Sequence, residues 1–244
     1  PTLALSKHPG AHAMVALGQR LPRPKAVVVI SPHRQAASFE VGIAPQFHAW
    51  HDFRGFATEL YELRYEPPGS PELAQSLLQK IAVAGLPTRA SDDARIDHGI
   101  WVPLRLMWPQ ADIPVVPVAI TEAGPDAHLA LGQALSGLAA QNVLVIGSGS
   151  ITHNLRDLNF GEEFAAAYPW AQTFDDWIAG HLAAGDTQSL CAYRTLAPQA
   201  AHAHPTEEHL MPLFVALGAG GRASPLYRGL SYGSVSLSAY AFGP

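Results

Sequence analysis

A buried strand is predicted by the stretch AVVVISPH, residues 26–33. It begins with an apolar run that contains four consecutive β-branched residues, and such a run favours extended structure covered on both faces. Prolines at positions 22 and 24 separate this strand from a helical pattern over residues 11–20, because proline interrupts a helix. We expect the strand to end at Ser31, which places His33 just beyond its carboxyl end.

Strands and helices alternate along the rest of the chain. Further strands are predicted at residues 115–120, 143–146 and 234–242, and helices at residues 59–64, 70–84, 100–107, 126–140, 170–184 and 207–217. This alternation is typical of an α/β fold with a mainly parallel central sheet flanked by helices. A chain of 244 residues is long enough for one core, so we expect a single domain. Its active site should lie at the carboxyl ends of the strands.

The composition indicates which partners and which cellular compartment are expected for this protein. The net charge is −5 without a basic cluster, which argues against a nucleic-acid partner. No apolar run in the sequence reaches the roughly 18 residues of a membrane span, so we expect no membrane partner. Cys191 is the single cysteine, which suits a reducing compartment. We therefore expect a cytoplasmic protein, while the sequence leaves open whether it is a monomer or a homo-oligomer.

Three histidines follow turn motifs that lie far apart in the sequence. His33 follows Ser31-Pro32, His153 follows the turn GSGSIT, and His209 ends the motif PTEEH. His33 and His153 come soon after strands that are predicted to be buried. Because the carboxyl ends of parallel strands meet at one edge of a sheet, these side chains are expected to converge. Histidine is the commonest metal ligand, so the pattern predicts a metal site in an enzyme.

Each motif also has a simpler explanation. The glycine-rich turn before His153 could cradle a phosphate, although it lacks the lysine and the spacing of a P-loop. Thr206 is a plausible N-cap for the helix predicted at residues 207–217, and Glu207 and Glu208 would then suit its dipole. Adjacent helical residues point about 100° apart, so only one of Glu208 and His209 is expected to face a metal.

A fourth histidine, His98, stands between Asp97 and Gly99 at the start of a predicted helix. Asp97 is expected either to cap this helix or to act beside His98, which could hydrogen-bond a substrate oxygen. His51 and Asp52 form a similar pair with less support. The remaining histidines are expected at the surface: His8, His12, His48, His128, His181, His202 and His204.

Taken in order, these motifs resemble a known family. SPH at 31–33, HDFRGF at 51–56, DHGIW at 97–101, GSGSITHNL at 147–155 and PTEEH at 205–209 are similar to motifs of the extradiol ring-cleaving dioxygenases of the DOPA-dioxygenase type. These enzymes belong to the class III superfamily, which includes the protocatechuate 4,5-dioxygenase catalytic subunit. The resemblance covers nearly the whole chain, down to YGSVS at 232–236.

The resemblance implies a non-haem Fe(II) site, often occupied by zinc, that cleaves a small aromatic diol with O₂ to a semialdehyde. His33 and His209 match metal ligands. His153 matches the histidine that acts as acid and base beside the metal and that also coordinates it in zinc-loaded forms. His98 matches a second active-site histidine near the substrate and O₂.

Members of the family begin with a strand and a His-Gly-x-Pro turn whose histidine is another ligand, and Pro1 matches the proline of that turn. We therefore expect one catalytic domain over residues 1–244, with this strand and turn missing before Pro1. Either the upstream residues lie outside this chain, or the molecule lacks one ligand. Two alternative functions stay open: a zinc-dependent hydrolase that uses the same histidines, and a metal-poor binding protein of the same fold without catalysis.

Overall fold

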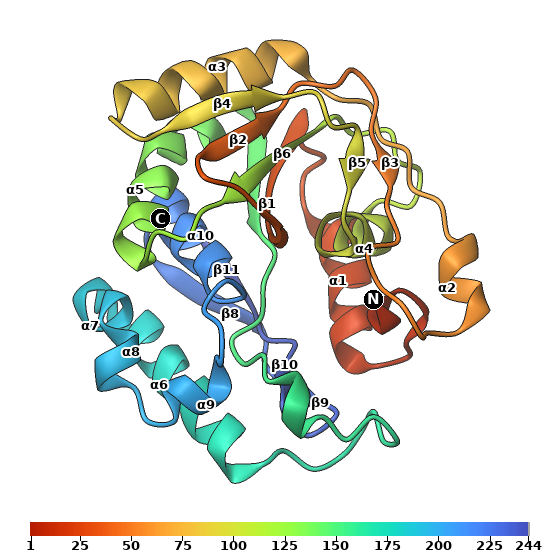
Figure 1. Cartoon of the computed structure of the whole chain (residues 1–244), viewed down its shortest axis with the longest axis vertical. Helices are drawn as coiled ribbons and strands as arrows, with labels where there is room; N and C mark the ends of the chain where they lie inside the picture. Colours follow the sequence, from red (N-terminus) through yellow and green to blue (C-terminus); the bar gives the residue numbers. More distant parts are fainter. Residues whose placement is uncertain (244) are drawn as a thin grey trace.

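The computed structural model describes residues 1–243, and its centre is a five-stranded sheet in the order β4-β2-β6-β1-β7 (Figure 1). β1 (Ala26–Gln35), β6 (Val115–Ile120) and β7 (Val143–Gly147) are parallel. β2 (Phe39–Gly42) runs antiparallel to β6 and pairs in parallel with β4 (Thr88–Ser91). The prediction of a single α/β domain with a mainly parallel sheet is confirmed.

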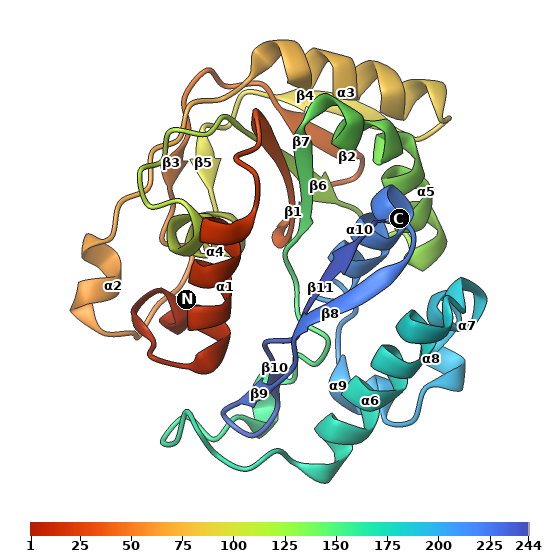
Figure 2. The same cartoon turned by 180° about the vertical axis from the view of Figure 1, so that it is seen from behind.

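Helices cover both faces of this sheet. α1 (Pro9–Arg20) and α4 (His98–Met107) pack on one face, and α3 (Pro71–Val83), α5 (Pro125–Leu135) and α10 (Met211–Gly220) pack on the other (Figures 1 and 2). The two layers explain why β1 carries no polar residue before Ser31. A strand with apolar neighbours on both faces is stable only if both sets of its side chains are apolar.

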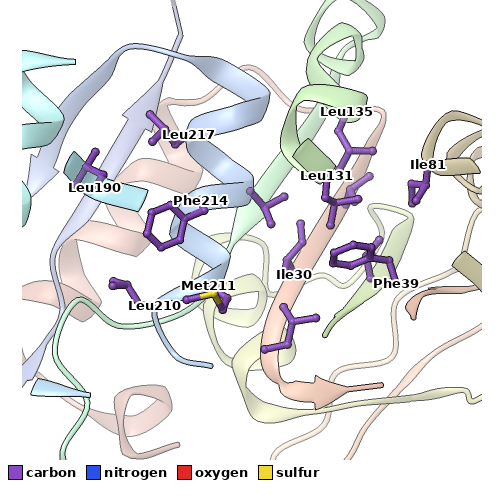
Figure 3. Close-up of a cluster of buried hydrophobic side chains, with 14 of the residues drawn as sticks. Ile30, Phe39, Ile81, Leu131, Leu135, Leu190, Leu210, Met211, Phe214 and Leu217 are labelled. Carbon is purple, nitrogen blue, oxygen red and sulfur yellow. The ribbon is translucent and has the colours of Figure 1, made fainter. Parts of the chain in front are cut away.

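The side chains of β1 alternate between two cores. Val27 and Val29 pack with α1 and α4, while Val28 and Ile30 pack with the opposite layer, and none of the four is exposed. Figure 3 shows Ile30 among side chains from β2, α5 and α10. Burying side chains of this size stabilises the fold by about 1.5–3 kcal/mol each.

The remaining elements are short or lie outside the sheet. Helices α6 to α9 gather at one end of the molecule, near two antiparallel ribbons, β8 with β11 and β9 with β10 (Figure 1). The bounds are β3 His48–Ala49, β5 Arg95–Ile96, α2 Thr58–Glu62, α6 Pro169–Ala184, α7 Thr187–Cys191, α8 Tyr193–Leu196, α9 Ala200–Ala203, β8 Ala223–Tyr227, β9 Leu230–Ser231, β10 Val235–Ser236 and β11 Ala239–Phe242, with 3₁₀ turns at Thr2–Leu5, Ser136–Gln141 and Leu155–Asp157. None of the helices within residues 1–243 has both the length and the apolar character needed to cross a bilayer, and the cytoplasmic location stays a prediction.

The first strand is longer than predicted. It does not end at Ser31 but continues to Gln35, so that His33 lies within the strand. Only residues 26–30 pair with β7; beyond them β1 pairs with β6 alone, and its register breaks between Ser31 and Gln35. His33 therefore stands on an extension of β1 that reaches past the end of β7.

The helix predicted at residues 207–217 begins later, at Met211. Pro212 lies in its first turn, where a missing backbone N–H costs nothing. Thr206 is therefore not its N-cap, and instead its hydroxyl donates to Glu208 Oε1 at 2.9 Å. Because Glu208 and His209 precede the helix, the helical angle of about 100° on which the expectation for these two residues rested does not apply.

The last predicted strand, residues 234–242, is two short strands, β10 and β11, that belong to different ribbons. The break falls at Leu237 and Ser238, where the hydroxyls of Ser236 and Ser238 both donate to the buried carboxylate of Asp175, at 2.7 and 3.0 Å. The helix predicted at residues 126–140 ends as an α-helix at Leu135 and continues as a 3₁₀ turn. The other predicted elements are confirmed to within two residues at each end.

The close contact of α5 with α10 generates a stability prediction. A Cβ atom on Gly132 would lie 2.2 Å from the carbonyl oxygen of Val215, so Gly132→Ala should destabilise the fold by about 1–3 kcal/mol. Gly180 in α6 has no such neighbour within 4 Å, and Gly180→Ala should stabilise the fold by about 0.5–1 kcal/mol. Urea unfolding measures both changes, and a shift of the two variants in the same direction would show that the helix contact is not this tight.

Candidate metal centre

Four histidines from four separate elements meet at the carboxyl edge of the sheet. The ring centroids of His33 and His98 are 4.1 Å apart, and those of His33 and His209 are 5.0 Å apart. His153 stacks on His209 with 3.3 Å between centroids and an interplanar angle of 8°. The sequence singled out all four of these residues, and the structure brings them together.

His33 and His98 approach each other because α4 begins against β1. Asp97 caps α4 by accepting from the Gly99 backbone N–H at 2.9 Å, and it also accepts from the Ser31 hydroxyl at 2.5 Å. A Cβ atom on Gly99 would lie 2.4 Å from Ser31 Oγ and 3.2 Å from His33 Cδ2. Glycine is therefore required at this contact, and the prediction that Asp97 caps the helix is confirmed.

The glycine-rich turn after β7 serves a similar close approach. Cβ atoms on Gly147 and Gly149 would lie 2.1 Å from the carbonyl oxygen of Pro212 and 2.3 Å from that of His209. The backbone N–H of Ser150 donates to the His209 carbonyl at 2.9 Å. These glycines let the turn that carries His153 pack on the segment that carries His209, which explains them without a bound phosphate.

His209 is oriented by the carboxylate next to it. Glu208 Oε1 lies 2.9 Å from His209 Nδ1, and this hydrogen bond lowers the pKa of Glu208 to about 2. An ionised carboxylate only accepts hydrogen bonds, so Nδ1 carries the proton and Nε2 keeps a free lone pair. Among the described residues 1–243, no group bonds this buried Nε2. A buried nitrogen without a partner, among other imidazoles, fits a metal ion.

His98 has a carboxylate partner of the same kind, Asp52. Asp52 Oδ1 lies 2.9 Å from His98 Nδ1 and accepts from the His98 backbone N–H at 3.0 Å. Burial alone would raise the pKa of Asp52, but the hydrogen bonds and charge of His98 outweigh it and lower that pKa. Sequence patterns point only weakly to Asp52, because nothing in the local pattern links residue 52 with residue 98.

His33 and His153 are held neutral by their surroundings. Burial and, to a smaller extent, the neighbouring ring (His98 for His33, His209 for His153) together lower the pKa of each imidazole to about 3. Neutral imidazole is the form that coordinates a metal. Two groups of side chains place their ligand atoms within 4.8 Å of one another: His33 with Asp52 and His98, and His153 with Glu208 and His209.

Three histidines that were expected at the surface are buried instead. His8 caps α1 through Nδ1, His128 bonds the Gly124 carbonyl, and His204 bonds the Ile151 carbonyl at 2.7 Å. Each ring satisfies a backbone group in the interior, which polarity alone does not reveal. None of the three belongs to the cluster.

One cavity adjoins the cluster without containing it. It has a volume of about 550 Å³, follows β7, and reaches His209 at one end, but it is not lined by His33, His98 or His153. Pro1 lies near Asp52 and His33. The first residue of this chain thus stands beside the histidines, while the upstream strand and turn stay a prediction.

Comparison with known proteins identifies the family. Residues 11–243 match the family described as the catalytic LigB subunit of aromatic ring-opening dioxygenase. The chain belongs to this family. It is therefore an enzyme of the aromatic ring-opening dioxygenase class, which makes the alternative of a binding protein without catalysis the weaker one.

Relatives match over most of their length. The chain is 39% identical to the 4,5-DOPA dioxygenase extradiol of Beta vulgaris, over 90% of this chain and 83% of that protein. It is 34% identical to the protein of the same name in Escherichia coli, over 93% of this chain and 85% of that protein. A solved structure, the uncharacterized protein JW3007 from Escherichia coli K12, superposes with a TM-score of 0.81 at 29% identity, covering 96% of this chain and 92% of that one.

The lowered histidine pKa values predict how the metal-free fold responds to acid. In the unfolded chain these imidazoles take up a proton near pH 6.5, whereas folded His33 and His153 do so only near pH 3. The unfolded state therefore binds more protons between these values, and the free energy of unfolding falls as the pH falls from 7 to 5, by on the order of 1 kcal/mol for each histidine. Urea unfolding in the presence of a chelator measures this loss.

His153→Gln should make the loss smaller, and His48→Gln, at an exposed position, should leave it unchanged. An equal pH dependence in His153→Gln and the unaltered protein would show that the pKa of His153 is not lowered in the folded state.

Proposed function

We propose that this protein catalyses extradiol cleavage of a catechol-type ring with O₂, at a non-haem Fe(II) ion, to give a semialdehyde. The observation that carries the proposal is the convergence of four imidazoles, one of which, His209, has a buried Nε2 without a partner within residues 1–243. The family and the names of the relatives support the reaction type.

His33 and His209 are the residues we propose as metal ligands, and His153 is close enough to His209 to join them when zinc is bound. A site built from nitrogen ligands suits Fe(II) and Zn(II). When bound, Fe(II) supplies Lewis acidity that lowers the pKa of the substrate hydroxyls, together with open coordination positions.

His153 is proposed to move protons. Its neutral ring accepts a proton from a catechol hydroxyl and returns it during ring opening, which is general acid–base catalysis. Burial and the neighbouring rings lower the pKa of His153 to about 3, and an anionic catecholate beside it would raise that pKa towards neutrality. Substrate binding would therefore place the ring in the range where it exchanges protons at neutral pH.

His98 and Phe53 are proposed to hold the substrate. The Phe53 ring meets the His98 ring edge to face, with 5.6 Å between centroids, and Phe53 itself is buried. The pair offers a hydrogen-bonding nitrogen beside an apolar wall, which suits a molecule with both hydroxyls and an aromatic ring. Since several relatives are named for 4,5-DOPA, we propose DOPA as the first catechol to test.

The reaction is tested by reconstituting the protein with Fe(II) without O₂ and then adding air with DOPA, caffeate or protocatechuate. We expect a coloured ring-fission product from at least one catechol, and equal consumption of O₂ and substrate. The absence of product with every catechol would refute the proposed function. Turnover of an ester or amide without O₂ would support the alternative of a zinc hydrolase.

Two variants separate the roles of the histidines. His33→Ala should lose bound iron, because it removes a ligand, whereas His153→Ala should keep most of the iron and lose turnover by about 10²–10⁴-fold, the usual contribution of a general acid–base group. Iron content and single-turnover rates measure the two effects. Normal iron binding by both variants would contradict the proposed ligands.

A further inference from the structure

The His98 ring lies against His33 in the cluster, but its hydrogen bonds go to Asp52, which is not one of the four histidines. One oxygen, Asp52 Oδ1, receives both the backbone N–H and the ring Nδ1 of His98, at 3.0 and 2.9 Å. Two bonds from one residue to one acceptor fix the position of the imidazole as well as its rotation. Within residues 1–243 both hydrogen bonds of His98 to side chains go to Asp52, and neither involves the other ring nitrogen, Nε2.

The N-terminus of α4 stabilises the negative charge of Asp52. His98 is the first residue of α4, so its backbone N–H is one of the donors that the helix leaves unpaired. The positive end of the helix dipole favours an anion at this position. An ionised carboxylate can only accept, and His98 Nδ1 must therefore be the donor.

A carboxylate also bonds Nδ1 of His209: Glu208 is the partner there, and Nε2 has no partner within residues 1–243. Within residues 1–243 no carboxylate bonds the His153 ring, which stacks on His209 instead. Of the two histidines in the cluster that are not proposed as permanent ligands, only His98 thus has its tautomer set by the protein. A histidine with a fixed tautomer presents the same nitrogen to every substrate molecule.

We propose that Asp52 is a positioning residue that fixes the Nδ1-protonated tautomer of His98 and so keeps Nε2 as a hydrogen-bond acceptor for a substrate hydroxyl. This inference rests on the proposed function, because the hydroxyl belongs to the proposed catechol. The carboxylate acts only through the imidazole.

Asp52→Asn tests this role. The amide keeps the shape of the carboxylate and an acceptor for the backbone N–H, but it removes the charge and permits the other tautomer. We expect kcat to fall by about 10–100-fold, as for other carboxylates that orient active-site histidines, with KM within about twofold and iron content unchanged. Asp52→Glu keeps a carboxylate and should recover part of kcat.

A second measurement does not depend on activity. In ¹⁵N NMR of the zinc-loaded protein, the two ring nitrogens of His98, assigned by their loss in His98→Gln, should be protonated at Nδ1 and unprotonated at Nε2. Asp52→Asn should shift protonation towards Nε2. The matched control is Asp186→Asn, because Asp186 bonds His181 Nδ1 at 3.0 Å on the surface. It should alter the His181 signals and leave those of His98 and the activity unchanged.

The inference is overturned if Asp52→Asn keeps the His98 tautomer or the full kcat. It is also overturned if this variant loses iron, since Asp52 would then be a ligand with His33 and His98. An unaltered enzyme that is inactive on every catechol would refute the proposed function instead, while the ¹⁵N signals would still decide the tautomer.

Discussion

The burial of β1 between two parallel neighbours and two helix layers is the constraint on which the site depends. Its register aligns Ile30 with Gly147 of β7, and this fixes the strand extension that carries His33 relative to the turn that carries His153. The Ser150–His209 backbone bond then ties the segment before α10 to the same edge. Three chain segments far apart in sequence are thus held in place by backbone pairing.

Electrostatics divides the four histidines into two kinds. Glu208 and Asp52 each bond an Nδ1 atom, which determines the proton position on His209 and His98. His33 and His153 have no such support and are kept neutral by burial and by the neighbouring rings. Within this cluster, therefore, the protein sets the tautomer of two imidazoles and the charge of the other two.

The sequence predicted the sheet and the four histidines because both depend on local patterns. The apolar runs predicted β1, β6 and β7, and the histidines stood out because His33 and His153 follow strands and His98 and His209 lie in motifs near the starts of helices. β2 and β4 were missed because each has only four residues. Glu208 and His209 were wrongly placed inside a helix, because the helix begins only at Met211, with Pro212 in its first turn. Asp52 was undervalued because its contact with His98 arises from tertiary packing.

Anomalous diffraction at the iron edge, from crystals of the protein reconstituted with Fe(II), tests most directly that these histidines form a metal centre. We predict a single peak within coordination distance of ring nitrogens of His33 and His209, with His209 binding through Nε2. A peak elsewhere, or none beside these rings at full iron loading, would contradict the metal centre proposed for this fold.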